Sequence, residues 1–206
     1  MVHNQGKKDN KLIVISGPSG VGKNSIVKEL LKDSELNLHY SVSCTSRSIR
    51  DGEVNNEAYH FISREEFESK IKNDEFIEYT EYLGNYYGTL KSEIFDNIDK
   101  KTVLLEIEYK GLENLKKIFQ NSVYIVSIGV LPYHSEDIEH IGKLIDSRLK
   151  KRNLDHPEII KKRLSYILKE ELIKYNNKLY NYIVYNKDQN LSETIKEVKK
   201  IILKNC

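Results

Sequence analysis

The stretch that most constrains the fold covers residues 12–25 and reads LIVISGPSGVGKNS. Its four apolar residues at 12–15 predict a strand buried on both faces, as in a parallel sheet. A glycine-rich segment with the spacing G-x-x-x-x-G-K runs from Gly17 to Lys23, and apolar residues then recur at helical spacing. Such a loop points backbone N–H groups, the positive end of a helix and a lysine ammonium at one place. The order of strand, loop and helix therefore predicts a phosphate-binding loop.

One position departs from that pattern. Asn24 stands where Ser or Thr is expected, and Ser25 comes one residue later. Glycine-rich turns between a strand and a helix also occur for packing alone. The lysine and the flanking elements in register favour the phosphate site over that alternative.

Composition limits the kinds of protein this chain can be. Its 206 residues suit one domain, and 31% charged residues with a net charge of +2 give no reason to expect nucleic acid as the main partner. No apolar run approaches the roughly 20 residues of a membrane helix. Residues 1–10 look like a loose polar tail without the apolar centre of a signal peptide, so we expect no membrane partner and a cytoplasmic location. The two cysteines, Cys44 and Cys206, predict free thiols, and the histidine spacing predicts no zinc.

Strand-like and helix-like segments alternate along most of the chain. Further core strands are predicted at 103–107, 123–128 and 182–185, and helices at 112–119, 138–149 and 195–202. This alternation predicts an α/β fold with a parallel sheet flanked by helices. Short strands predicted at 40–44, 59–62, 75–83 and 86–89 indicate a small, partly antiparallel subdomain inserted in the main sheet.

Polar residues and a proline predict where several helices begin. Ser63 and Glu66 have the spacing of a capping box. Ser135 is a candidate cap for the long helix that contains residues 138–149. Asp155 and Pro157 are expected to start the next helix, because proline suits the first helical position.

Four short motifs between residues 43 and 89 add to the phosphate-binding loop. They are Ser43-x-Thr45-x-Arg47-x-x-Arg50-x-Gly52-Glu53, Tyr59-x-Phe61, Phe76-Ile77-Glu78-Tyr79 and Gly84-Asn85-Tyr86-Tyr87-Gly88-Thr89. Together with that loop they resemble the guanylate kinases of the nucleoside-monophosphate kinase family, and the resemblance runs from residue 12 to about 202. The family implies a P-loop fold with a parallel five-stranded core sheet, an inserted mixed-β GMP-binding subdomain and a helical lid. In this chain that gives one domain over 11–206, with the core at 11–39 and 90–206, the subdomain at about 40–89 and the lid at about 146–164.

The activity implied by the resemblance is phosphorylation of GMP, and also of dGMP, to the diphosphate. ATP is the co-substrate, Mg²⁺ the cofactor, and transfer is direct and in line. The catalytic residues implied are Lys23, Arg47, Arg148, Arg152 and Arg163. The ATP-binding residues implied are Gly17, Pro18, Ser19, Gly20, Val21, Gly22, Lys23, Asn24, Ser25 and Asn186. The GMP-binding residues implied are Ser43, Arg47, Arg50, Glu53, Tyr59, Glu78, Tyr87, Thr89 and Glu108. Ser25, and Glu106 through water, would serve the metal.

Elementary chemistry agrees with several of these assignments. Two arginines three residues apart on a loop, Arg47 and Arg50, can fork onto phosphate oxygens. Guanine presents N1–H and a 2-amino group side by side, which suits the carboxylate of Glu78, whereas adenine lacks both donors. Taken singly, the arginines could be solvated loop residues, Glu78 the polar face of a strand, and Glu106 a strand-end carboxylate capping a turn.

Two other functions remain open from the sequence. One is a catalytically weak binding module with a guanylate-kinase-like fold, which Asn24 favours to some degree. The other is a phosphate-loop kinase for a different acceptor. A monomer and a homodimer are both compatible with the sequence.

Overall fold

A computed structural model describes residues 11–206 except 121, 133–137, 153–154, 173–178 and 188–189. Its centre is a five-stranded sheet in the order β2-β7-β1-β8-β9, in which every pair of neighbours is parallel. The strands are β1 (Lys11–Ser16), β2 (Leu38–Tyr40), β7 (Thr102–Glu106), β8 (Tyr124–Leu131) and β9 (Tyr182–Tyr185). The predicted parallel core sheet is confirmed.

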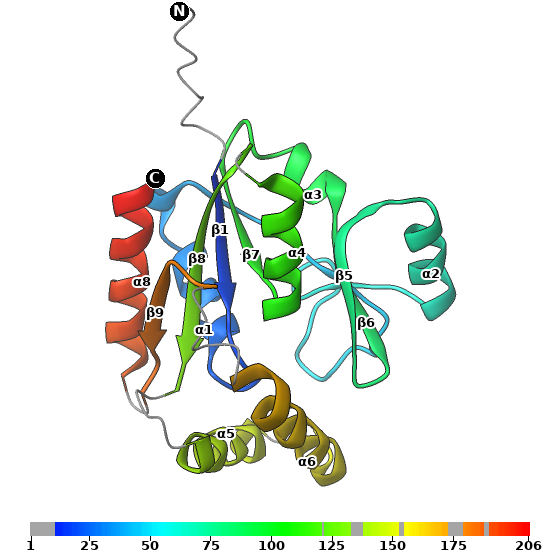
Figure 1. The fold of residues 1–206 in the computed structure, drawn as a ribbon, viewed down its shortest axis with the longest axis vertical. Coiled ribbons are helices and arrows are strands. Elements are labelled where there is room, and N and C mark those ends of the chain that lie inside the picture. Colours follow the sequence, from blue (N-terminus) through cyan, green and yellow to red (C-terminus); the bar gives the residue numbers. More distant parts are fainter. Residues whose placement is uncertain (1–10, 121, 133–137, 153–154, 173–178, 188–189) are drawn as a thin grey trace, which may run out of the picture.

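Strand β1 is buried on both faces, as its unbroken apolar run predicts. Ile13 and Ile15 point into one hydrophobic cluster, while Leu12 and Val14 point into another on the opposite face. The helices α1 (Lys23–Leu31) and α8 (Leu191–Asn205) contribute to the first cluster; α3 (Lys91–Phe95) and α4 (Tyr109–Phe119) contribute to the second. The result is a three-layer arrangement with helices on both faces of the sheet (Figure 1).

A second, mixed sheet projects from the side of this core (Figure 1). Its order is β4-β3-β6-β5, with β3 and β4 parallel and the other pairs antiparallel. The strands are β3 (Cys44–Thr45), β4 (His60–Phe61), β5 (Phe76–Tyr82) and β6 (Asn85–Leu90), and the helix between them is α2 (Arg64–Lys72). Phe67 of α2 stacks on Phe76, with ring centroids 4.3 Å apart, and this contact fixes the helix on the small sheet. The Oγ atom of Ser63 accepts a hydrogen bond from the N–H of Glu66, so the predicted N-cap is confirmed.

The prediction of a single strand at 40–44 is wrong. Residues 38–40 pair with β7 in the core sheet, whereas Cys44 and Thr45 pair with β6 and β4 in the small sheet. Between them, the N–H of Ser41 donates to Leu104 O, and the N–H of Val42 donates to the carboxylate of Glu93. The chain therefore crosses from one sheet to the other, and its alternating pattern is shared between two ladders.

Two further helices cover the end of the core sheet beside the phosphate-binding loop. They are α5 (Ile138–Arg152) and α6 (Pro157–Tyr166), followed by the π-helical turn η2 (Ile167–Glu171); the short 3₁₀ helix η1 (Ser34–Leu36) follows α1. Pro157 is the first residue of α6, as predicted, but the N-cap position belongs to His156, and Asp155 turns toward arginines instead. The cap predicted at Ser135 lies outside the described residues. No helix in the described part of the chain combines the length and apolarity needed to cross a membrane.

Candidate active site

The loop between β1 and α1 curls around the side chain of Lys23. The Nζ atom of Lys23 donates to Gly17 O at 2.6 Å and to Pro18 O at 3.2 Å. Gly22, which directly precedes α1, has a φ of 95°, in the left-handed region that other residues rarely adopt. The loop thus holds a cation at the N-terminus of a helix, where an anion would be stabilised by both.

Asn186 supports this loop from behind. Its Nδ2 atom donates to Val21 O at 2.7 Å, and a Cβ atom added at Gly22 would lie only 2.4 Å from that nitrogen. The guanidinium of Arg148 in turn donates to Asn186 O at 2.7 Å. Asn186 and Arg148 therefore lie at the back of the loop, and their direct contacts with nucleotide stay predictions.

A cavity of about 670 Å³ opens between the loop, the small sheet and α6. Most of the residues predicted for the site line it: Ser19, Gly20, Gly22, Lys23, Asn24, Ser25, Ser43, Arg47, Arg50, Glu53, Tyr59, Glu78, Tyr87, Glu106, Glu108, Arg152 and Arg163. Six predicted residues are not among its lining residues: Gly17, Pro18, Val21, Thr89, Arg148 and Asn186. The fold thus brings residues from four separate parts of the chain to one concave surface.

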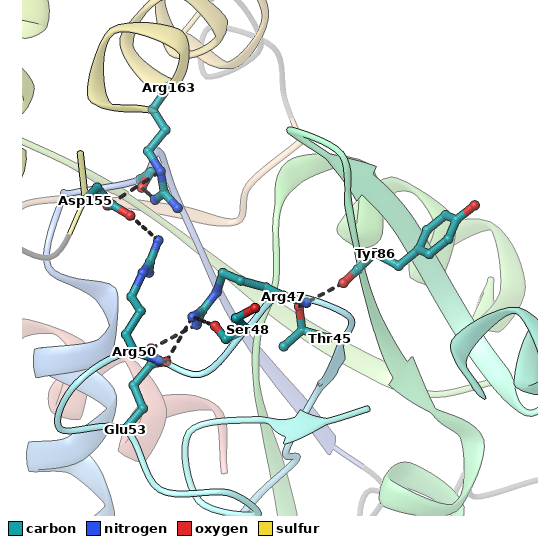
Figure 2. A network of polar contacts seen from close by, with 9 residues as sticks. Thr45, Arg47, Ser48, Arg50, Glu53, Tyr86, Asp155 and Arg163 are labelled. Atoms are coloured by element: carbon teal, nitrogen blue, oxygen red, sulfur yellow. Dashed lines mark hydrogen bonds and ion pairs between the residues drawn. The ribbon is translucent and has the colours of Figure 1, made fainter. Parts of the chain in front are cut away.

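Glu53 fixes the first predicted phosphate-binding arginine. Its two carboxylate oxygens accept from Arg47 Nη2 at 2.9 Å and Nη1 at 3.0 Å, and one of them also accepts from the N–H of Arg50 at 2.9 Å (Figure 2). Burial opposes ionisation of Glu53, but the hydrogen bonds from Arg47 and from the Arg50 backbone prevail and lower its pKa. The guanidinium of Arg47 is consequently held in one plane beside the rings of Tyr59 and Phe61.

A second carboxylate, Asp155, lies between two more arginines. Its Oδ1 atom is 2.5 Å from Arg50 Nη2, and its Oδ2 atom is 3.7 Å from Arg163 Nε (Figure 2). Arg163 also donates through Nη1 to Ser19 Oγ at 3.0 Å. Asp155 lies within the predicted lid and was expected near the start of a helix, but the sequence reasoning did not predict it as a site residue. Its position in the sequence between two predicted lid arginines, Arg152 and Arg163, was the signal that could have identified it.

Two buried carboxylates, those of Glu78 and Glu108, line the cavity together. Glu78 is only 6% exposed and accepts a hydrogen bond from Thr89 Oγ1 at 2.6 Å. Burial raises the pKa of Glu78 to about 7, against the hydrogen bond from Thr89 and with help from the charge of Glu108. Burial also raises the pKa of Glu108, whose Oε2 atom has no hydrogen-bond partner within the described residues. These two carboxylates can therefore accept hydrogen bonds from N–H donors of a ligand.

The oxygens near the loop are of the kind that Mg²⁺ prefers. Glu106, at the end of β7, lines the cavity with Ser25 and Asn24, and burial raises its pKa while the charges of Lys23 and Arg152 oppose that rise. A carboxylate, a hydroxyl and an amide oxygen fit a hard cation that keeps several waters. Across the described ranges no group of three or more His, Cys, Asp or Glu could hold a metal alone. Nucleotide phosphates and water would therefore have to supply the remaining ligands.

Comparison with known proteins gives one consistent result. The family model described as guanylate kinase matches residues 9–205. A guanylate kinase of Mycoplasmoides gallisepticum is 39% identical over 206 residues, covering 99% of this chain and 97% of the relative. A guanylate kinase of Clostridium tetani is 39% identical, covering 93% and 84%. The crystal structure of guanylate kinase from Anaplasma phagocytophilum superimposes with a TM-score of 0.66 at 27% identity, covering 95% of this chain and 85% of that one.

Proposed function

The chain belongs to the guanylate kinase family, and from this premise we propose that it transfers the γ-phosphoryl group of ATP to GMP in the cavity described above. It is a nucleoside-monophosphate kinase, so the open questions concern which residues perform which part of the reaction. The observation that carries our assignment is the buried Glu78, in one cavity with arginines and a phosphate-binding loop.

Glu78 and Glu108 would select the base. Guanine offers two adjacent donors, N1–H and the 2-amino group, to carboxylate oxygens that are buried away from water. A site built for such donors rejects an analogue without them by roughly 10⁴-fold or more, because its buried acceptors would stay unpaired. Thr89 orients Glu78 from behind through its 2.6 Å hydrogen bond. Ser43, which lines the same cavity, is our candidate for a further contact to the base.

Arg47, Arg50, Tyr59 and Tyr87 would hold the phosphate of GMP. Arg47 is already fixed by Glu53, so little conformational entropy is lost when phosphate binds. The two tyrosines line the cavity and lie edge to face, with centroids 5.9 Å apart. These residues come from the acceptor segment, residues 40–89, which we propose as the GMP-binding unit of a single domain spanning 11–206.

The phosphate-binding loop would hold the phosphates of ATP. Lys23 would exchange its hydrogen bonds with Gly17 O and Pro18 O for phosphate oxygens. Mg²⁺, held near Ser25 and through water near Glu106, would supply charge neutralisation for the phosphates. Arg152 and Arg163 line the cavity near the loop and would stabilise the negative charge on the transferring group.

An assay of ADP release with ATP and Mg²⁺ tests this function. GMP should be turned over far faster than AMP, CMP and UMP, and Lys23→Ala should lower kcat/KM by about 10² or more. Lys32→Ala is the matched control, because that lysine is exposed and pairs with Glu29 on the surface of α1. Equal use of AMP and GMP would refute the assignment of Glu78. Binding of GMP without turnover of any nucleotide would indicate a binding module instead.

A further inference from the structure

Three arginines from two separate parts of the chain line the cavity and lie close together. Arg47 and Arg50 belong to the acceptor segment, whereas Arg163 lies on α6. Like charges this close repel one another: burial lowers the pKa of Arg50 first, and the charges of Arg47 and Arg163 lower it further. The arrangement needs compensating negative charge. Glu53 accepts hydrogen bonds from the Arg47 guanidinium and from the Arg50 backbone N–H, and its charge also opposes the lowering of the pKa of Arg50.

Asp155 supplies further negative charge to this group of arginines, because its two carboxylate oxygens face different arginines. Oδ1 lies 2.5 Å from Arg50 Nη2 and Oδ2 lies 3.7 Å from Arg163 Nε, and the three side chains are only 6–16% exposed. Arg163 continues the chain of contacts, because its Nη1 atom donates to Ser19 Oγ of the phosphate-binding loop at 3.0 Å. A continuous set of polar contacts thus joins the acceptor segment to the donor loop through one carboxylate.

We propose that Asp155 is a positioning residue that couples the two nucleotide sites. It orients Arg50 toward the acceptor phosphate and Arg163 toward the donor phosphates at the same time, so each bound nucleotide organises the arginine that serves the other. This inference rests on the proposed function, since it takes GMP and ATP as the two ligands. Coupling of this kind is reciprocal, and its usual size is a change in affinity of about 5- to 150-fold.

A purely structural role for Asp155 is the alternative. A carboxylate near the N-terminus of α6 would stabilise that helix by interacting with its dipole, but this stabilisation does not depend on either nucleotide. It would change the free energy of unfolding while leaving the coupling intact. A competing role is that Asp155 occupies Arg50 in place of the GMP phosphate, in which case removing its charge would tighten GMP binding.

The test measures the dissociation constant of GMP by calorimetry, with and without Mg²⁺ and a non-hydrolysable ATP analogue. In the natural protein the analogue should tighten GMP binding at least about 5-fold. Asp155→Asn should reduce that factor to less than about 2, with the affinity for GMP alone changed by less than about 3-fold, and Asp155→Glu should restore part of it. Asp146→Asn is the matched control, because that aspartate on α5 pairs with Lys150 by helical spacing and should leave the factor unchanged.

Several outcomes would overturn the proposal. The first is an absence of coupling in the natural protein. The second is a coupling factor that stays unchanged in Asp155→Asn, or that falls equally in Asp146→Asn. The third is tighter binding of GMP alone by Asp155→Asn. If Asp155→Asn fails to fold, Asp155→Glu carries the test, because it keeps the charge but alters the contact: its factor should lie below that of the natural protein, and an unchanged factor would overturn the proposal. Turnover of GMP without coupling would refute only this inference, whereas absence of GMP binding or turnover would refute the proposed function.

Discussion

The pH dependence of GMP binding gives a direct test of Glu78. Burial places the pKa of this carboxyl at about 7, and guanine's two donors require its ionised form. At pH 6 only about a tenth of the protein carries the ionised carboxylate, whereas at pH 8 about nine-tenths does. We therefore expect GMP to bind about tenfold more weakly at pH 6 than at pH 8 through Glu78 alone.

The phosphate of GMP also titrates, with a pKa of about 6, so the measurement needs a matched variant. Glu78→Gln keeps the phosphate effect and removes the carboxyl, and its amide oxygen can still accept from Thr89 Oγ1. Calorimetry gives the ratio of the GMP dissociation constant at pH 6 to that at pH 8. This ratio should be about tenfold larger in the natural protein than in Glu78→Gln. Equal slopes in the two proteins would refute a role for the ionised Glu78 in binding guanine.

The same shift has a consequence for stability. The pKa of Glu78 is higher in the folded protein than in the unfolded chain, so protonation of this carboxyl stabilises the fold. The stabilisation is fully present below about pH 4.5 and is lost as the pH rises through 7. The shift from 4.5 to about 7 corresponds to about 3 kcal/mol. Urea denaturation should show the free energy of unfolding of the natural protein falling by about that amount relative to Glu78→Gln between pH 4 and 8. A constant difference between the two would contradict the raised pKa.

Three other substitutions test the remaining assignments. In Gly111→Ala the new Cβ atom would lie 2.7 Å from Glu78 Oε2, so steady-state kinetics should show a raised KM for GMP and an unchanged KM for ATP; an unchanged KM for GMP would mean that the carboxylate moves freely. Asn186→Ala leaves a buried loop carbonyl without its donor, which should lower the free energy of unfolding by about 1–3 kcal/mol and raise the KM for ATP several-fold, while GMP affinity stays as it was. Ser25→Ala should raise the Mg²⁺ concentration for half-maximal turnover more than Asn24→Ala does; the opposite order would make the amide the working ligand.

Local patterns in the sequence were sufficient to predict most of the fold. The apolar run at 12–15 is buried on both faces of the core sheet because no polar residue interrupts it. The glycines and Lys23 predicted the loop, since the left-handed φ of Gly22 and the spacing to the lysine are local properties. The strand predicted at 40–44 failed for a related reason: an alternating pattern predicts strand conformation but does not say which sheet each residue joins.

The candidate site was predicted less completely. Motif spacing predicted Arg47, Arg50 and Glu78 as site residues, and these three line one cavity. The fact that Glu53 clamps Arg47 with both oxygens could have been inferred, because the two residues are only six apart. Their roles in binding nucleotide stay predictions that the substitutions above address.

The tertiary structure alone decided which distant residues meet. Asp155 pairs with Arg50, 105 positions away in the chain, and Asn186 holds the loop at Val21, 165 positions away. Hydrophobic periodicity says which face of an element is buried, but an ion pair between distant segments leaves no periodic trace in the sequence. Which carboxylate meets which arginine depends on how the elements that carry them cross, and that is fixed only when the two sheets, α5 and α6 pack together.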